Sequence, residues 1–206
     1  MRVRVAPAER FALAGAAAVL LLQSAGLGPA LEYRRAMLAA EPWRLLTGHL
    51  VHANWRHAVL NALAWVALAR LYAPELAPAR QATLLAGSAL AISLLLWVAA
   101  PDVAWYRGLS GALHGVFAAG ACLWLARPAA GTLPGAQRGA QRARLWPALL
   151  LAAVWGKVLA EQTLGPMANE NWLGVAVITR SHLFGAAAGT VLGILTAALR
   201  PDTIRT

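Results

Sequence analysis

Charged residues are scarce in this chain: Asp, Glu, Lys and Arg make up 13% of its 206 residues, whereas hydrophobic residues make up 60%. A soluble domain carries about twice that share of charge. The shortage excludes an ordinary soluble protein and predicts an all-α protein that crosses a membrane several times. A net charge of +10 would indicate nucleic-acid binding in a soluble chain. Here the basic residues lie between apolar stretches, as orientation signals do, so no nucleic-acid partner is expected.

Cysteine is nearly absent as well. The single Cys122, which we expect to fill space in the core, excludes a disulfide within the chain and a zinc site built on cysteines. No cysteine pair, acidic ligand cluster or phosphate-binding motif is found, so no metal, nucleotide or redox cofactor is expected. His49 and His52 lie three residues apart and raise the question of a metal site. Helical HExxH spacing is missing, which favours a structural role for both.

What the chain has instead is a series of apolar stretches of membrane-spanning length. A bilayer core of about 30 Å needs roughly 20 apolar residues in a helix. Six stretches bounded by Pro and Gly fit that length: about 11–28, 56–73, 82–100, 107–126, 146–163 and 179–199. We expect a single membrane domain over 1–206, with a structured surface loop at 29–55 and a flexible connection at 127–145.

The distribution of basic residues predicts how the six segments are oriented. The side that holds both termini carries eleven Lys and Arg residues, and the opposite side carries seven. Basic residues favour the cytoplasmic side, so both termini are expected in the cytoplasm. The first segment also resembles a secretory signal peptide, because the basic run MRVRVAPAER precedes an apolar stretch. Its removal would leave the orientation of the remaining five segments unchanged.

Ser110 and His182 are the candidate nucleophile and base of a catalytic site. Ser110 lies in GLSGALHG and His182 in SHLFGAAAG, each at the outer start of a predicted segment. At 1.5 Å per residue, Ser110 would lie about 5 Å below the start of its helix. A lone membrane serine more often bonds to its own or a neighbouring helix. Because polar residues at this depth are costly and usually functional, the pair favours nucleophilic catalysis.

Glycines accompany both residues. Around Ser110 and after His182 they form two groups: Gly108, Gly111 and Gly115, then Gly185, Gly189 and Gly193. The second group shares one helix face with His182. Small residues let helix backbones approach closely, so this face is expected to touch the helix of Ser110. Ordinary helix packing would require the same glycines, so the spacing alone does not separate packing from catalysis.

His57 and Asn61 are candidate donors to an oxyanion. They lie four residues apart, hence on one helix face, at the expected depth of Ser110. Side-chain N–H groups of this kind can hold an oxyanion together with the backbone N–H of the nucleophile. Interhelical hydrogen bonding is the alternative role. No buried carboxylate is evident near His182, so a Ser–His dyad is expected rather than a triad.

Together these motifs resemble the rhomboid intramembrane serine proteases. The run WRLLTGHLVHANWRHAVLNALAW (Trp43 to Trp65), GLSGALHG and SHLFGAAAG occur in the order typical of that family. The resemblance implies a six-helix rhomboid-like bundle with Ser110 and His182 as catalytic residues. It implies an oxyanion site of His57, Asn61 and the Ser110 N–H. Supporting roles are implied for Arg44, His52, Gly108, Gly111, Gly185 and Gly189.

Position 114 separates this chain from many rhomboids, which carry there a Tyr that stacks on the catalytic histidine. The chain has His114, and in this it resembles the rhombosortase branch. That branch implies a bacterial inner-membrane enzyme, open to the periplasm, whose substrates end in Gly-Gly, one transmembrane helix and a basic tail. The alternatives are a general rhomboid protease and a non-catalytic chaperone or adaptor for membrane helices. A small transporter is disfavoured because no inverted repeat is found.

Overall fold

The computed structural model describes residues 5–127, 136–167 and 170–199, with the side chains of all these except 136–143. The long helices in these ranges are α1 (Pro7–Ser24), α4 (Trp55–Leu71), α5 (Pro78–Ala99), α6 (Ser110–Leu125), α7 (Ala136–Leu164) and α9 (Thr179–Ala198). The short elements are α2 (Gly28–Leu31), β1 (Tyr33–Arg34), η1 (Arg35–Met37), α3 (Arg44–Thr47), β2 (Trp105–Tyr106) and α8 (Glu170–Leu173). The described part of the chain is therefore an all-α bundle with one small two-stranded ladder.

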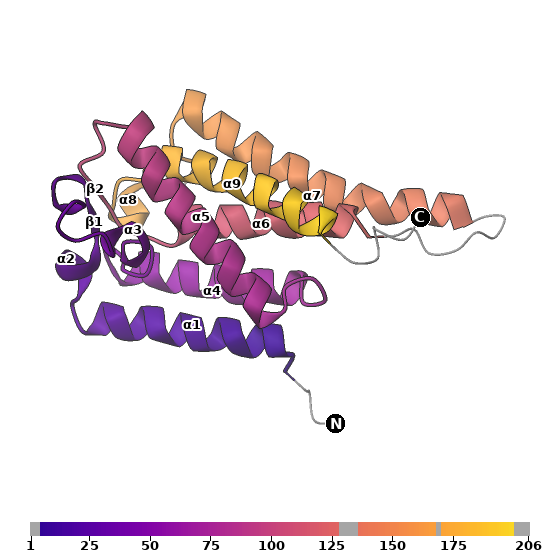
Figure 1. The fold of residues 1–206 in the computed structure, drawn as a ribbon, viewed down its shortest axis with the longest axis horizontal. Coiled ribbons are helices and arrows are strands. Elements are labelled where there is room, and N and C mark those ends of the chain that lie inside the picture. The colour runs from indigo at the N-terminus through magenta and orange to yellow at the C-terminus, as the bar shows by residue number, and fades with distance from the viewer. Residues whose placement is uncertain (1–4, 128–135, 168–169, 200–206) are drawn as a thin grey trace.

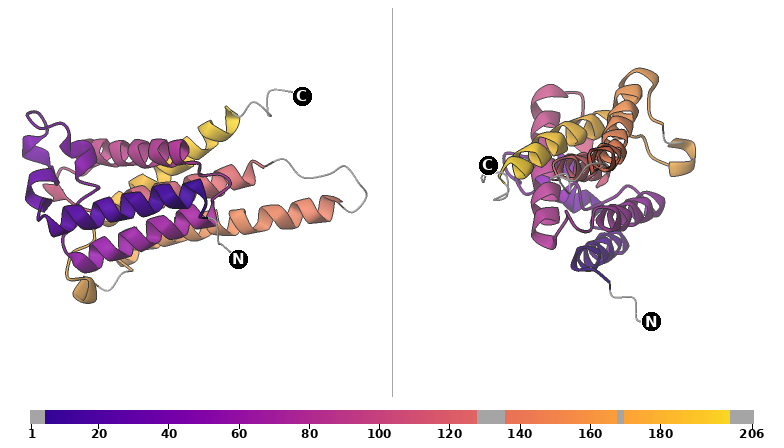
Figure 2. Two further views of the ribbon diagram at one scale, coloured as in Figure 1. Left: turned by 90° about the horizontal axis from the view of Figure 1, so that it is seen from below. Right: turned by 90° about the vertical axis from the view of Figure 1, so that its right-hand side faces the viewer.

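The short elements α2, α3, β1 and β2 gather at one end of the bundle (Figures 1 and 2). The start of α1 and the end of α9 lie at the opposite end. β1 pairs with β2 in antiparallel register, with Tyr33 opposite Tyr106 and Arg34 opposite Trp105. The segment expected as a structured loop, 29–55, is thus structured, and the ladder ties it to the turn that precedes Ser110.

Helix α6 forms the centre of the bundle. It packs against α4, α5, α7 and α9, and 11 of its 16 residues are buried. Its sequence SGALHGVFAAGACLWL contains mostly small and apolar residues, which suits a helix covered on all sides. Cys122 is one of the buried residues of this core. A central position for α6 places Ser110, at its first residue, under the gathered short elements.

Each predicted segment overlaps one long helix, but several boundaries were wrong. Helix α1 covers Pro7–Ser24 rather than 11–28, and α5 begins at Pro78 rather than at 82. The segment expected to begin at 107 begins at Ser110, because β2 occupies 105–106 and Gly108 has a φ of 130° that no right-handed helix allows. Ser110 is therefore the first residue of its helix rather than one turn inside it. The flexible connection expected at 127–145 was wrong from Ala136 onward, where α7 begins. Ala, Gln and Arg dominate 136–145 and favour helix, and α7 continues through Pro147. The stretch 128–135 of that prediction lies outside the described residues.

Two of the described helices, Pro78–Ala99 and Thr179–Ala198, are long and apolar enough to cross a membrane by length and composition. Helix α6 is comparably apolar but shorter. Among the others, α4 has 17 residues, and α7 carries Lys157 and Glu161 in its apolar half. Length and composition therefore identify two membrane spans among the described helices, and the total of six spans stays a prediction.

Candidate active site

The turn that leads into Ser110 is held from three sides. The Gly108 N–H donates to the carbonyl oxygen of Gly48 at 3.0 Å, and the hydroxyl of Tyr106 donates to the Gly108 carbonyl at 2.6 Å. The Leu109 N–H donates to Nε2 of the buried His52 at 3.4 Å. At Gly108 a Cβ would lie 2.6 Å from the His57 ring, and its positive φ strains any other residue. The surface loop thus fixes the backbone from which Ser110 projects.

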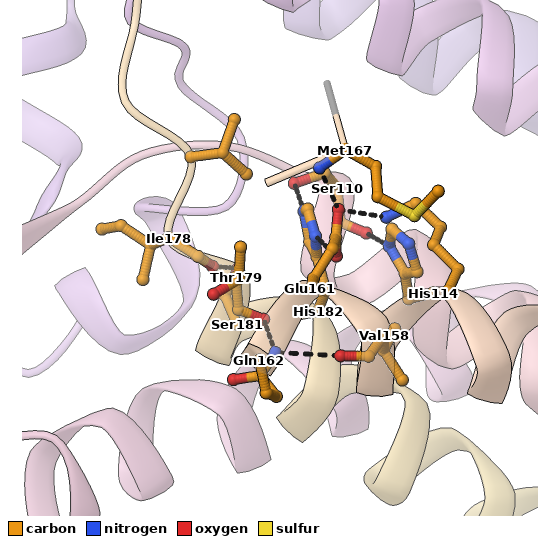
Figure 3. Close-up of polar contacts among 12 residues, drawn as sticks. Ser110, His114, Val158, Glu161, Gln162, Met167, Ile178, Thr179, Ser181 and His182 are labelled. Atoms are coloured by element: carbon orange, nitrogen blue, oxygen red, sulfur yellow. Dashed lines mark hydrogen bonds and ion pairs between the residues drawn. The ribbon is translucent and has the colours of Figure 1, made fainter. Parts of the chain in front are cut away.

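Ser110 and His182 meet across α6 and α9. The Oγ of Ser110 lies 3.0 Å from Nε2 of His182, although 72 residues separate them in sequence. Figure 3 shows the two side chains facing each other above the ends of their helices. The approach depends on the glycines, because a Cβ on Gly185 would overlap the Gly111 carbonyl oxygen. A serine hydroxyl hydrogen-bonded to an imidazole is the geometry that proton removal from a nucleophile requires.

His114 packs against one face of the His182 ring. The rings of His114 and His182 are stacked, with centroids 4.3 Å apart and an interplanar angle of 19°. Nδ1 of His114 lies 2.8 Å from the Ser110 carbonyl oxygen, which can only accept, so that nitrogen carries the proton. His114 therefore stacks on His182 and also holds the first turn of α6.

A buried carboxylate lies beside His182, and the expectation that none was near it was wrong. Oε2 of Glu161 lies 2.8 Å from Nδ1 of His182, and Glu161 is 2% exposed. Its other oxygen accepts a hydrogen bond from Nζ of Lys157 at 2.7 Å. Helix α7 supplies both residues and packs against α9. The carboxylate is three residues from the end of α7, which brings it level with the starts of α6 and α9 (Figure 3).

His57 and Asn61 lie on the α4 side of the same site. Nδ1 of His57 is buried and has no hydrogen-bond partner among the described residues. The side-chain amide of Asn61 donates one hydrogen bond, of 2.9 Å, to the His57 carbonyl, which leaves its second N–H hydrogen. Ser110 is the first residue of α6, and the first N–H groups of a helix lack acceptors inside it. His57, Asn61 and Ser110 all line one cavity, so side chains of the type that can donate to an oxyanion lie along its wall beside the candidate nucleophile.

These side chains surround a cavity of about 610 Å³. Its polar lining residues come from the four helices α4, α6, α7 and α9, and they include His57, Asn61, Ser110, His114, Lys157, Glu161 and His182. The remaining lining is apolar, and Leu60, Leu113, Phe117, Leu173 and Val177 contribute to it. A polar cluster in an apolar cavity is typical of a site that binds an apolar chain and acts on one polar group within it.

The other candidate residues lie outside this cavity. Arg44 is buried in the surface loop, where it donates to the Glu32 carbonyl at 2.8 Å and pairs with Glu41. Nε2 of His49 lies 3.0 Å from Oγ of Ser93, which joins the loop to α5. Both residues stabilise the loop. Within the described residues, no group of three His, Cys, Asp or Glu side chains is placed to hold a metal ion.

Comparison with known proteins places the chain in a family. A model of the Rhomboid domain matches residues 39–199, which include every residue of the cavity. The chain belongs to the rhomboid family. Rhomboids are intramembrane serine proteases that act on membrane-anchored proteins in the bilayer. A search of curated protein sequences finds no match to the chain.

Glu161 lies in this cavity beside His182, and the sequence analysis did not anticipate it. A signal for it existed, because Lys157 and Glu161 form a charged i, i+4 pair inside an otherwise apolar segment. The predicted segment 146–163 ends on the outer side of the membrane. The segments that contain Ser110 and His182 begin on that same side. Glu161 therefore lies at the same expected depth as Ser110 and His182. What the sequence could not give was the rotation of α7 that points Glu161 at the ring.

Proposed function

We propose that this rhomboid is an active serine endopeptidase in which Ser110 is the nucleophile and His182 the general base. The observation that carries the proposal is the 3.0 Å contact between Ser110 Oγ and His182 Nε2 at the wall of an apolar cavity. A serine that only packs between helices does not require a histidine beside its hydroxyl. A histidine that only packs does not require side chains such as Asn61 with a spare N–H group in the same cavity. Both catalytic positions are retained, which argues against an adaptor without activity.

The mechanism follows from the positions of the side chains. His182 accepts the proton of Ser110 as Oγ attacks the scissile carbonyl carbon. The negative oxygen then receives hydrogen bonds from His57, Asn61 and the Ser110 N–H. His182 gives the proton to the leaving amine, and the acyl group stays on Ser110. Water, deprotonated by His182, releases the acyl group and restores the enzyme.

The proposal includes six membrane spans with both termini in the cytoplasm. Six long helices of the described residues match the six apolar segments, and the start of α1 lies at the same end of the bundle as the end of α9 (Figure 2). The excess of basic residues assigns that end to the cytoplasm. The site at the opposite end then opens toward the periplasm of a bacterial inner membrane.

The proposed substrate is a membrane-anchored protein with a C-terminal Gly-Gly, one transmembrane helix and a basic tail. His114 at the stacking position supports this rhombosortase-type specificity. A protease must act on an extended segment, and each glycine weakens a helix by about 1 kcal/mol relative to alanine. A Gly-Gly pair near the outer face would therefore unwind readily where Ser110 lies. Cleavage there would release the body of the substrate into the periplasm.

Co-expression with a tagged substrate tests the proposal. Matched substrates carry Gly-Gly or Leu-Leu at the junction, and Ser110→Ala serves as the inactive control. Cleavage of Gly-Gly alone, at a position fixed by mass spectrometry, is the expected result. Equal cleavage of both substrates would indicate a general rhomboid protease. Binding of substrate by the wild type without cleavage would indicate an adaptor, and would contradict the proposal.

A further inference from the structure

Three residues from three helices form a continuous hydrogen-bonded line in the cavity wall. Ser110 Oγ contacts His182 Nε2 at 3.0 Å, and His182 Nδ1 contacts Glu161 Oε2 at 2.8 Å. Figure 3 draws both contacts and shows Glu161 and Ser110 on opposite sides of the imidazole. We propose that Glu161 is a positioning residue for the proteolytic reaction, so that the site works as a Ser–His–Glu triad. The inference rests on the proposed function and extends it.

The contacts determine where the imidazole proton lies. A carboxylate can only accept, so the 2.8 Å contact to Glu161 requires a proton on Nδ1 of His182. In the neutral ring, Nε2 then carries the lone pair and can only accept. The hydrogen bond to Ser110 is therefore donated by the Oγ hydroxyl. Without Glu161, the ring could carry its proton on Nε2, which would present a donor to the nucleophile instead of a base.

The hydrogen-bond donors around the buried Glu161 argue that its carboxylate is ionised and held in place. Removing a carboxylate from water costs several kcal/mol unless donors replace the lost hydration. Around Glu161 the donors are Lys157 Nζ at 2.7 Å and the Met167 N–H at 3.4 Å, both to Oε1. Oε2 is left to His182 alone among the described residues. Lys157 therefore balances the negative charge of Glu161 through Oε1, while Oε2 accepts the hydrogen bond from His182.

The arrangement also has an electrostatic consequence during the reaction. When His182 takes the proton of Ser110, it becomes a cation in an apolar cavity. A carboxylate 2.8 Å from Nδ1 stabilises that cation at the moment it forms. Glu161 itself gains no proton, and the proton passes from Ser110 through Nε2 to the leaving amine. Glu161 acts through His182 and does not touch the substrate.

Replacement of Glu161 by Gln separates this role from packing. Gln keeps the size and a hydrogen bond, but its amide can donate to Nδ1 and hold the wrong tautomer. We expect kcat to fall about 10²–10⁴-fold with KM within about threefold of the wild type, as for loss of a triad carboxylate elsewhere. Glu161→Asp keeps the charge and should recover part of kcat at an equal folded fraction.

The matched control is Gln162→Ala. Gln162 is the next residue of α7 and also ties it to the start of α9, through a 3.3 Å hydrogen bond to the Thr179 carbonyl. Its removal should leave kcat within about threefold. The folded fraction of every variant is measured by thermal unfolding and gel filtration in detergent, so that kcat refers to folded protein only.

The outcomes distinguish this inference from the proposed function. If the wild type neither cleaves nor reacts with a serine-directed probe, the proposed function fails. If the wild type is active and Glu161→Gln retains kcat within threefold, only the triad fails. The triad also fails if Gln162→Ala loses as much kcat as Glu161→Gln, or if Glu161→Asp recovers nothing.

Discussion

Gly189 of α9 faces Gly115 of α6 so closely that a Cβ on Gly189 would overlap the Gly115 carbonyl group. One turn nearer the site, Gly185 and Gly111 repeat the relationship. Backbone contact between the two helices is what brings His182 within 3.0 Å of Ser110. The distance between the candidate base and nucleophile is therefore set by residues that take no part in the chemistry.

Gly189→Ala should lower both stability and activity. Overpacking in a closely packed interior costs about 1–3 kcal/mol and shifts the backbone. Gly156→Ala in α7 is the matched control, because a Cβ there would meet no described atom within 4 Å. That change should be neutral or stabilising by up to about 1 kcal/mol through helix propensity. Thermal unfolding in detergent measures both, and equal unfolding temperatures for the two variants would contradict the packing argument.

Ser110→Ala and His182→Ala should each abolish cleavage, and the double variant should be no worse than either one. Nucleophile and base act as a unit, so their losses do not add. The measurement is the cleavage rate of the Gly-Gly substrate by purified protein in detergent. Cleavage by Ser110→Ala above the uncatalysed rate, or additive losses in the double variant, would show that the two residues do not form one catalytic unit.

Asn61→Ala should lower kcat by about 10–10³-fold with little change in KM. Its free amide N–H is expected to bind the oxyanion, which exists only during the reaction. The variant also loses the 2.9 Å bond to the His57 carbonyl, which is a bond within one helix, so stability should mostly survive. A large drop in unfolding temperature together with a raised KM would instead make Asn61 a packing residue.

The outline of the fold was predictable because membrane helices are long and apolar, and each predicted segment overlaps one long helix. The start of α6 was not, because the backbone at Gly108, with its φ of 130°, is held by a hydrogen bond to Gly48, which is distant in sequence. The Ser110–His182 contact was anticipated from shared depth and shared glycines. Glu161 was missed because the side to which a helix turns its one acidic residue is decided by packing against its neighbours.

Stability should fall in mild acid because of the histidines in the loop between α3 and α4. Burial lowers the pKa of His49 to about 4 and that of His52 to about 3. Their ordinary value is 6.5, so below that pH the unfolded chain binds protons that the folded chain does not. Above pH 6.5 both histidines are neutral in the folded and the unfolded chain, so they do not make the free energy of unfolding depend on pH there. That free energy falls as the pH drops toward the folded values.

His52→Gln tests this pH dependence. Gln keeps an acceptor for the Leu109 N–H and removes one titrating group, which accounts for up to about 1.4 kcal/mol per pH unit. Thermal unfolding at pH 7.5 and pH 5 should therefore show a smaller loss for His52→Gln than for the wild type. The same loss in both proteins would mean that His52 is not buried as a neutral ring.

Reaction with a fluorophosphonate probe tests the central claim most directly, because only an activated serine displaces the fluoride. The folded wild type in detergent is incubated with the probe, and the modified residue is located by mass spectrometry. The account predicts a single adduct on Ser110 that disappears in Ser110→Ala and is strongly reduced in His182→Ala. No adduct on the folded wild type, or an adduct that survives in Ser110→Ala, would contradict it.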